Sequence, residues 1–203
     1  KKFKFGIIGP GRIATKFSDS LQTLSNEAEV YAIASREEKR SQEFAKKFRA
    51  SKIYTTYEGL AQDPEVDIVY IATPHPFHFE QAGMCLKNHK AVLCEKPMAL
   101  NVRQAEKMIE ASEKSGAKLM VAHCWRFDED VLWLKKQSKK LGKIVRTKGY
   151  GVHSHWGPAG WFTQKHLAGG GALADMGIHA LDTTRFLLDD PKPVSVYAKL
   201  GTY

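Results

Sequence analysis

Short apolar runs alternate along this chain with longer segments in which apolar residues recur every three or four positions. The apolar runs predict strands at residues 3–8, 30–34, 53–54, 67–72, 91–94 and 118–122. The segments between them predict helices at residues 10–24, 37–48, 57–62, 78–86 and 101–115. The nearly continuous apolar run at 67–72 is typical of a strand buried on both faces of a parallel sheet. The alternation therefore predicts right-handed βαβ units and a doubly wound parallel sheet over residues 1–124.

The pattern changes beyond residue 124. The sequence there predicts, in order, a basic helix at 130–141, an alternating strand-like stretch at 143–153, an aromatic, glycine-rich loop at 156–171, a helix at 172–188 and a strand at 193–200. Two strands are too few for a sheet with a covered face. We therefore expect residues 125–203 to be the start of an α+β domain with an incomplete antiparallel sheet. Either the chain is a fragment or another chain completes that sheet.

A glycine-rich turn follows the first strand, with the spacing Gly9-x-Gly11-x-x-Ala14. In a dinucleotide-binding unit, the first glycine makes the tight turn and the second lets a pyrophosphate approach the backbone. The third small residue lets the helix pack close to the strand, and the N–H groups at the start of that helix face the phosphates. The alternative is a tight strand-to-helix turn without a ligand. The strand before the glycines and the helix after them favour the dinucleotide site.

The charge of the chain permits an anionic partner. Its 203 residues include 31 Lys and Arg against 22 Asp and Glu, a net charge of +9. The basic residues are spread over helical segments that also carry Glu, and the densest cluster, Lys135-Lys136 with Lys139-Lys140, fits a solvated helix face. We therefore expect no nucleic-acid partner.

Apolar runs and cysteines exclude two further classes. No apolar run approaches the roughly 20 residues of a membrane span, so we expect no membrane partner. The three cysteines, Cys85, Cys94 and Cys124, lie far apart and have no zinc-site spacing. We therefore expect no metal, reduced thiols and a cytoplasmic location.

Four motifs resemble those of one known family. They are Gly6-Ile7-Ile8-Gly9-x-Gly11-x-Ile13-Ala14, Ala72-Thr73-Pro74, Glu95-Lys96-Pro97 and Gly169-Gly170-Gly171-Ala172-Leu173-x-Asp175-x-Gly177-x-His179. In this order they resemble the glucose–fructose oxidoreductase/inositol dehydrogenase family of NAD(P)-dependent dehydrogenases, close to its dihydrodiol and sugar dehydrogenase branch. The resemblance implies a Rossmann domain at 1–124 and a substrate and oligomerisation domain at 125–203. The implied reaction is hydride transfer between a nicotinamide and a secondary alcohol or carbonyl of a small polyol, sugar or dihydrodiol.

Three residues are candidates for the chemistry. Lys96 follows a strand at the edge where doubly wound sheets bind ligands, and its ammonium can hydrogen-bond a reacting oxygen. Asp175 and His179 lie four residues apart on a predicted helix, so the carboxylate can orient the imidazole for proton exchange. The alternatives are a lysine at a surface turn and a polar helix pair in the core. The resemblance assigns all three residues to catalysis and substrate binding.

The end of the second strand indicates the cofactor. NAD-preferring sites place Asp or Glu there to bind the ribose hydroxyls, whereas this chain has Ser35-Arg36. Arg36 can stack on adenine and pair with a 2′-phosphate, with Arg40 one turn further on. We therefore expect NADP. The alternative is NAD, with Arg36 exposed and balanced by Glu37.

The resemblance also implies further contacts. Together with Lys96, the implied cofactor-binding residues are Gly9, Gly11, Arg12, Ile13, Ser35, Arg36, Arg40, Thr73, Pro74, His75, His78, Glu95, Trp125 and Arg126. The implied substrate contacts are Lys96, His155, Trp161, Asp175 and His179. A homo-oligomer, dimer or tetramer, through the C-terminal sheet is implied as well. The chain departs from the family at Trp161-Phe162, where Trp-Arg is common, and the alternative function is a non-catalytic NADP-binding sensor or scaffold.

Overall fold

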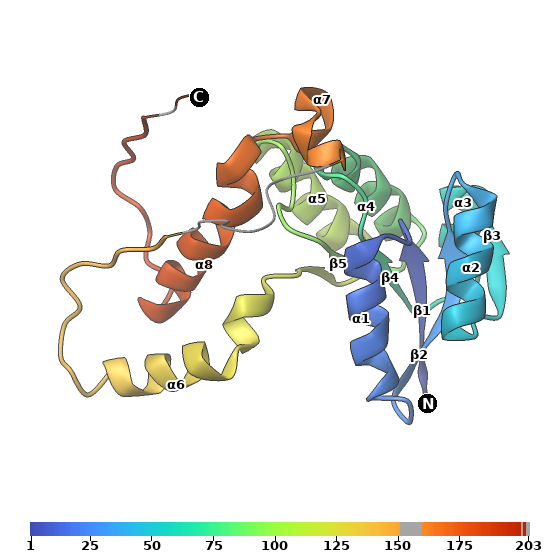
Figure 1. The fold of residues 1–203 in the computed structure, drawn as a ribbon, viewed down its shortest axis with the longest axis horizontal. Helices are drawn as coiled ribbons and strands as arrows, with labels where there is room; N and C mark the ends of the chain where they lie inside the picture. The colour runs from blue at the N-terminus through green and yellow to red at the C-terminus, as the bar shows by residue number, and fades with distance from the viewer. Residues whose placement is uncertain (151–159, 200, 202–203) are drawn as a thin grey trace. The chain divides into compact units, whose positions relative to one another are not determined.

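The computed structural model describes residues 1–150, 160–199 and 201, which form two compact units (Figure 1). The first unit combines Lys1–Ala122 with Ser154–Asp175, and the second combines His123–His153 with Met176–Tyr203. Each unit is therefore built from two separate stretches of sequence.

A six-stranded parallel sheet forms the centre of the first unit. Its strands are β1 (Phe3–Ile8), β2 (Ala28–Ala34), β3 (Lys52–Tyr54), β4 (Ile68–Ile71), β5 (Ala91–Cys94) and β6 (Leu119–Val121). They lie in the order β3-β2-β1-β4-β5-β6, and every neighbouring pair is parallel. Ile8 is opposite Ala34 and Ile71, and Ile71 is opposite Cys94, so the carboxyl ends of these strands are level. The predicted doubly wound sheet is confirmed, with its switch point between β1 and β4.

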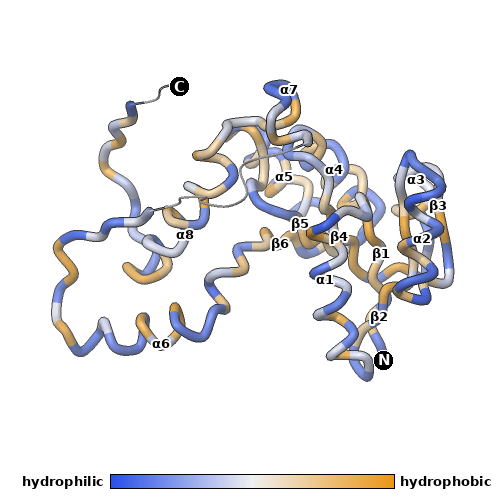
Figure 2. The backbone as a smooth tube through the Cα atoms, in the orientation of Figure 1, coloured by the Kyte–Doolittle hydropathy of each residue, from blue (hydrophilic) through white to orange (hydrophobic). Residues whose placement is uncertain are grey.

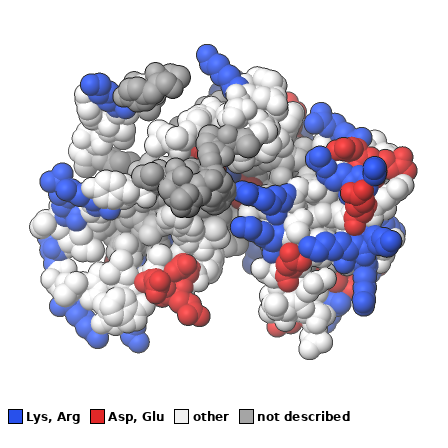
Figure 3. Space-filling view, viewed as in Figure 1, with Lys and Arg blue, Asp and Glu red and all other residues white. Residues whose placement is uncertain are grey.

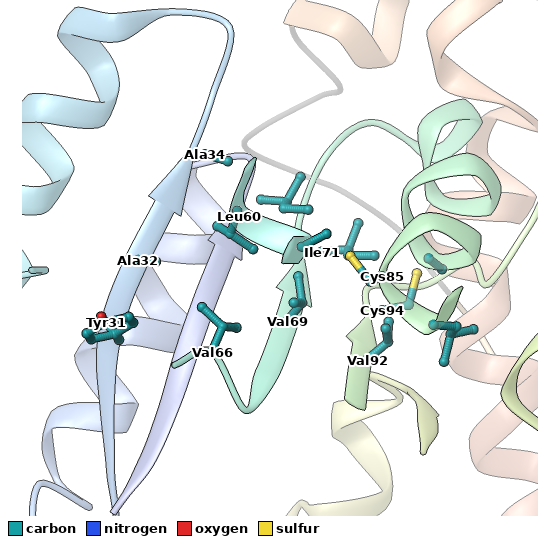
Figure 4. Packing of buried hydrophobic residues seen from close by; sticks show 14 of the residues in the cluster. Tyr31, Ala32, Ala34, Leu60, Val66, Val69, Ile71, Cys85, Val92 and Cys94 are labelled. Carbon is teal, nitrogen blue, oxygen red and sulfur yellow. The ribbon is translucent and has the colours of Figure 1, made fainter. Parts of the chain in front are cut away.

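Helices cover both faces of this sheet. They are α1 (Arg12–Gln22), α2 (Glu38–Phe48), α3 (Tyr57–Gln62), α4 (His78–Lys87) and α5 (Val102–Ser115). On one face, Ile7 and Ile33 pack with buried residues of α1 and α2. On the other, Val69 and Ile71 pack with Leu60 of α3 and with residues of α4 and α5 (Figure 4). Because both faces of the central strands are buried, those strands are mostly hydrophobic while the helices are mixed (Figure 2).

Local side-chain signals set the ends of α5. The Asn101 side chain accepts a hydrogen bond of 3.0 Å from the Gln104 N–H, which caps the first turn. Gly116 ends the helix with a left-handed φ of 69°. Between these ends, Met108 is fully buried in the core. The helix thereby returns the chain to the sheet at β6.

Three short helical turns complete the described elements of the first unit. They are η1 (His75–Phe77), η3 (Gly160–Thr163) and α7 (Lys165–Ala168). The turn η1 contacts α7, so the second stretch of this unit lies against the loop that follows β4.

The regular elements in the described part of the second unit are helices, and its predicted strands are absent there. Its elements are η2 (Cys124–Phe127), α6 (Glu129–Ser138) and α8 (Ile178–Leu187). A π-helical turn, η4 (Leu173–Gly177), leads into α8 where a regular helix was predicted. The predicted antiparallel strands are wrong for residues 143–150 and 193–199, which form no strand. A strand is stabilised by hydrogen bonds to a neighbour, and an alternating pattern alone does not provide that neighbour.

Candidate active site

The glycine turn between β1 and α1 has the geometry of a phosphate cradle. Gly9 has a φ of +86°, and a Cβ there would lie 2.8 Å from Thr73 Cγ2 and 3.0 Å from the Ala72 carbonyl. At Gly11, by contrast, a Cβ would meet nothing within 4 Å. The first turn of α1 has neither a side-chain cap nor an acidic residue. The open space at Gly11 and the uncapped helix start fit a dinucleotide pyrophosphate. Arg12 and Ile13 begin α1 with exposed side chains.

The end of β2 carries the residues predicted to choose the cofactor. The Ser35 hydroxyl accepts a hydrogen bond of 3.1 Å from the Glu37 N–H, and the Glu37 carboxylate pairs with Arg40 at 3.0 Å. The exposed Arg36 guanidinium lies 5.6 Å from the centre of the Phe77 ring. Thus Glu37 is engaged by Arg40 rather than by Arg36, and Arg36 extends towards the loop that follows β4.

His78 connects the loops that follow β4 and β5. One ring nitrogen lies 2.8 Å from the Thr73 carbonyl oxygen and the other 2.8 Å from that of Pro97. The side chain is fully buried, and burial lowers the pKa of His78. The Thr73 hydroxyl donates a 2.6 Å hydrogen bond to Gln81 within the same loop, next to the half-buried Pro74. The imidazole has no exposed surface and lies between the two loops, and the expected contact of His78 with a cofactor stays a prediction.

His75 is also turned inwards. It is 3% exposed, with Nδ1 3.0 Å from the Ala168 carbonyl oxygen and its ring centre 4.8 Å from that of Trp161, edge to face. Trp161 in turn stacks on Phe162 at 3.7 Å. Burial lowers the pKa of His75 to about 4. His75 therefore joins η1 to η3 and α7, and its expected contact with a cofactor stays a prediction.

Lys96 occupies a fixed position just beyond β5. Its Nζ donates hydrogen bonds to the Asp175 carbonyl oxygen at 2.8 Å and to the Asp175 carboxylate at 2.9 Å. The two side chains are 14% and 21% exposed. Beside them, Glu95 accepts a 2.6 Å hydrogen bond from the Tyr70 hydroxyl and one from the Lys96 N–H at 3.2 Å. The Lys96–Pro97 peptide bond is cis. Two predicted catalytic residues, Lys96 and Asp175, are thus brought together from positions 79 residues apart.

His179 lies in the first turn of α8, in the second unit. It is 7% exposed, and its ring stacks on Trp125 with centres 4.7 Å apart and planes at 18°. The pairing of Asp175 with His179, which was expected from one regular helix, stays a prediction. In the structure, η4 ends between the two residues, and the Asp175 carboxylate binds Lys96.

Arg126 forms ion pairs rather than presenting a free guanidinium. Its Nε and Nη2 donate to the Asp182 carboxylate, both at 2.7 Å, and Nη1 and Nη2 donate to Asp190 at 3.3 and 3.0 Å. These hydrogen bonds, despite partial burial, raise the pKa of Arg126. The guanidinium donors are thus directed to carboxylates of the second unit, and the expected role of Arg126 in cofactor binding stays a prediction.

Four further predictions concern His155, a metal site, a membrane span and the distribution of charge. His155 lies outside the described residues. Among the described residues, no group of three or more His, Cys, Asp or Glu side chains could hold a metal ion. In the same part of the chain, no helix is both long and apolar enough to span a membrane. Basic side chains of the first unit lie among acidic ones rather than in one field (Figure 3).

Sequence reasoning missed three residues that hold the site in place. Gln81 accepts from Thr73, Tyr70 holds Glu95, and Asp182 holds Arg126. Asp182 follows His179 by three residues, which indicates that both lie on the same side of a helix but does not indicate Arg126 as the partner. Tyr70 gave a weaker signal, because its hydroxyl sits in an apolar strand and finds its partner on the neighbouring strand's loop.

The fold and the glycine turn define a dinucleotide-binding Rossmann domain. A family model described as "Oxidoreductase family, NAD-binding Rossmann fold" matches residues 3–123. A second, described as "GFO/IDH/MocA C-terminal domain", matches residues 136–203. The chain belongs to the GFO/IDH/MocA family of oxidoreductases, as its motifs predicted.

Similar proteins include both curated and solved examples. A trans-1,2-dihydrobenzene-1,2-diol dehydrogenase of Danio rerio is 37% identical over 200 residues, which are 96% of this chain and 59% of the relative. An NAD-binding oxidoreductase from Klebsiella pneumoniae is 30% identical with a TM-score of 0.80, covering 93% of this chain and 53% of that one. A levoglucosan dehydrogenase in complex with NADH and levoglucosan is 25% identical with a TM-score of 0.79, covering 92% and 54%. The chain therefore spans somewhat more than half the length of these proteins.

Proposed function

We propose that this chain is part of an NADP-dependent dehydrogenase or reductase that acts on a secondary alcohol or carbonyl of a small polyol, sugar or dihydrodiol. The observation that carries the proposal is Lys96, which Asp175 holds at the ligand-binding edge of the sheet. The names of the Danio rerio relative and of the levoglucosan dehydrogenase support a small polyhydroxylated substrate.

Lys96 is suited to bind the reacting oxygen. An ammonium has three N–H donors, and Asp175 takes two of them in the described structure. The third donor is left for a substrate oxygen, and the charge stabilises the alkoxide that develops during oxidation. When bound, the nicotinamide supplies the hydride acceptor or donor. Asp175 is the positioning partner, because its carboxylate and carbonyl fix the ammonium.

We assign the proton exchange to His179. An imidazole changes charge near neutral pH, and stacking on Trp125 sets the plane of this ring. In oxidation, neutral His179 takes the proton from the substrate hydroxyl while the hydride leaves the carbon that bears this hydroxyl. In reduction, protonated His179 returns that proton to the oxygen.

We infer that the cofactor is NADP rather than NAD. No carboxylate follows β2 directly, and the nearest one, on Glu37, is paired with Arg40. Arg36 is exposed at that position and is a planar donor suited to a phosphate. The Arg36 guanidinium lies near Phe77, in the loop that follows β4. This position supports the proposal, because doubly wound folds bind their ligands beside the loops at the carboxyl ends of the strands.

We also propose a homo-oligomer, dimer or tetramer, formed through the C-terminal domain, and a cytoplasmic location. The location is supported by the buried thiols Cys85 and Cys94, whose pKa values are raised by burial. Light scattering of the protein after size-exclusion chromatography measures the oligomeric state, and a monomer would contradict this part of the proposal.

Cofactor binding and turnover test the function separately. NADP, supplied at about 100 times its dissociation constant, should stabilise the protein by about 2.7 kcal/mol in a thermal-shift titration. Hydride transfer is then followed by nicotinamide absorbance with a panel of polyols, aldoses and trans-dihydrodiols. Lys96→Ala should lower kcat at least about 100-fold while NADP binding is retained. The matched control is Lys107→Ala, an exposed lysine of α5, which should leave both unchanged.

Each outcome has a distinct meaning. Turnover that survives Lys96→Ala removes this lysine from the mechanism. Stabilisation by NADP without turnover on any substrate favours the non-catalytic sensor. Absence of stabilisation by both NADP and NAD would mean that the glycine turn binds no dinucleotide.

A further inference from the structure

An ion-pair cluster joins η2 to α8 in the second unit. The Arg126 guanidinium binds the Asp182 carboxylate through two hydrogen bonds of 2.7 Å. This two-donor pairing fixes both distance and orientation, which a single contact does not. The side chains are 28% and 12% exposed, so solvent screens the pair only in part. We call these two residues the clamp.

Neighbouring contacts hold the clamp on α8. The Arg126 guanidinium lies 5.3 Å from the centre of the Phe186 ring, one turn beyond Asp182. His123 Nδ1 lies 3.6 Å from Asp182 Oδ2. Asp190 binds the other side of the guanidinium, but at 3.0 and 3.3 Å and from a position beyond the end of α8. Asp182 is therefore the carboxylate that binds Arg126 from within α8, next to the Phe186 ring of the same helix.

Each residue of the clamp is close in sequence to one ring of the stack formed by Trp125 and His179. Trp125 directly precedes Arg126, and His179 precedes Asp182 by three residues on α8. Residues three apart lie on the same side of a helix. The bond between Arg126 and Asp182 thus holds the same two elements that bring the Trp125 and His179 rings to 4.7 Å and 18°.

We propose that the Arg126–Asp182 clamp is a positioning pair for His179: it holds the Trp125 indole against the imidazole and so sets the plane of the ring that exchanges the proton. The catalytic part of this inference rests on the proposed function of His179. The clamp touches neither substrate nor cofactor in this assignment. Arg126 and Asp182 act through Trp125 and His179.

The experiment compares Asp182→Asn and Arg126→Lys with the matched control Asp190→Asn. Asp182→Asn removes the charge of the clamp, and Arg126→Lys keeps the charge but removes the two-donor geometry. Asp190→Asn removes a carboxylate from the same guanidinium, together with its 3.9 Å ion pair to Arg185 of α8, and leaves the Arg126–Asp182 hydrogen bonds in place. Thermal melting of each variant shows whether it is folded. If Asp182→Asn does not fold, the measurements are made on Arg126→Lys.

Two measurements are made on each protein. The first is the proton resonance of the His179 ring, assigned by its loss in His179→Asn; the stacked indole should displace it upfield. The second is kcat and KM with the substrate found in the panel. We expect both clamp variants to lose the upfield displacement and about 100-fold in kcat, with little change in the KM for NADP. Asp190→Asn should retain both values.

The outcomes separate this inference from the proposed function. Retention of the upfield displacement in both clamp variants shows that the clamp does not hold the stack. Loss of the displacement with unchanged kcat shows that the stack does not serve catalysis. Either result overturns the inference while leaving the role of Lys96 intact. Turnover that survives His179→Asn refutes the proposed role of His179, and the catalytic role of the clamp with it.

Discussion

Replacing Gly9 and Gly11 by alanine, one at a time, should separate folding from cofactor binding. An alanine at position 9 would adopt a left-handed backbone with φ of +86° and place its Cβ 2.8 Å from Thr73 and 3.0 Å from the Ala72 carbonyl. The backbone conformation costs about 1–2 kcal/mol, and overpacking costs about 1–3 kcal/mol. Gly9→Ala should therefore destabilise the protein by about 2–5 kcal/mol.

Gly11→Ala should leave folding nearly unchanged. Its φ is −103°, and a Cβ meets nothing within 4 Å. Reduced freedom of the unfolded chain adds about 0.4–1 kcal/mol of stability, whereas alanine is a poorer helix cap by about 0.5–1 kcal/mol. These effects offset each other. The same Cβ fills the space through which a pyrophosphate reaches the backbone, so NADP affinity should fall at least about tenfold, or 1.4 kcal/mol.

Differential scanning fluorimetry and calorimetric titration with NADP measure the two effects. Gly9→Ala should lower Tm by about 4 °C or more, and Gly11→Ala by less than about 4 °C. NADP binding by Gly11→Ala at wild-type affinity would refute the assignment of this turn as the phosphate site. A Gly9→Ala variant as stable as wild type would refute the packing argument.

Two further predictions concern charge. Arg36→Asp should shift the ratio of the dissociation constants for NADP and NAD at least about tenfold towards NAD, because a carboxylate repels a 2′-phosphate and accepts hydrogen bonds from ribose hydroxyls. Calorimetry with both nucleotides measures this ratio, and an unchanged ratio would contradict the prediction. His75, with its pKa lowered by burial to about 4, should make stability fall as the pH drops from about 6.5 to about 4, because the unfolded chain takes up the proton first. The full effect is about 3 kcal/mol; urea unfolding of wild type and His75→Gln measures it, and equal slopes in that pH range argue against it.

The sheet was predictable because its signals are local. The apolar runs and the glycine spacing around Gly9 depend on neighbouring residues, and they predicted the doubly wound parallel sheet. The side-chain partners were less accessible. Arg126 finds Asp182 and Asp190 at sequence separations of 56 and 64 residues, and no local pattern indicates such pairs.

The two largest differences have the same physical origin. His78 has the sequence context of an exposed loop, and only the tertiary fold brings the Thr73 and Pro97 carbonyls to its two ring nitrogens. The alternating residues of 143–150 have the pattern of a strand, but in the described structure they pair with no neighbour. The local sequence indicates neither the Pro97 carbonyl, which is 19 residues from His78, nor whether a partner strand is present for residues 143–150.

The separation of Lys96 from Asp175 has a consequence for synthesis of the protein. The strands of the sheet are complete in the growing chain once Val121 has been added, whereas Asp175 follows 54 residues later. At about 5–20 residues per second, that interval lasts roughly 3–11 seconds. During it, the glycine turn already exists while the lysine still lacks its acceptor. A nascent chain can thus complete the glycine turn, the proposed nucleotide site, before Asp175 is available to position Lys96.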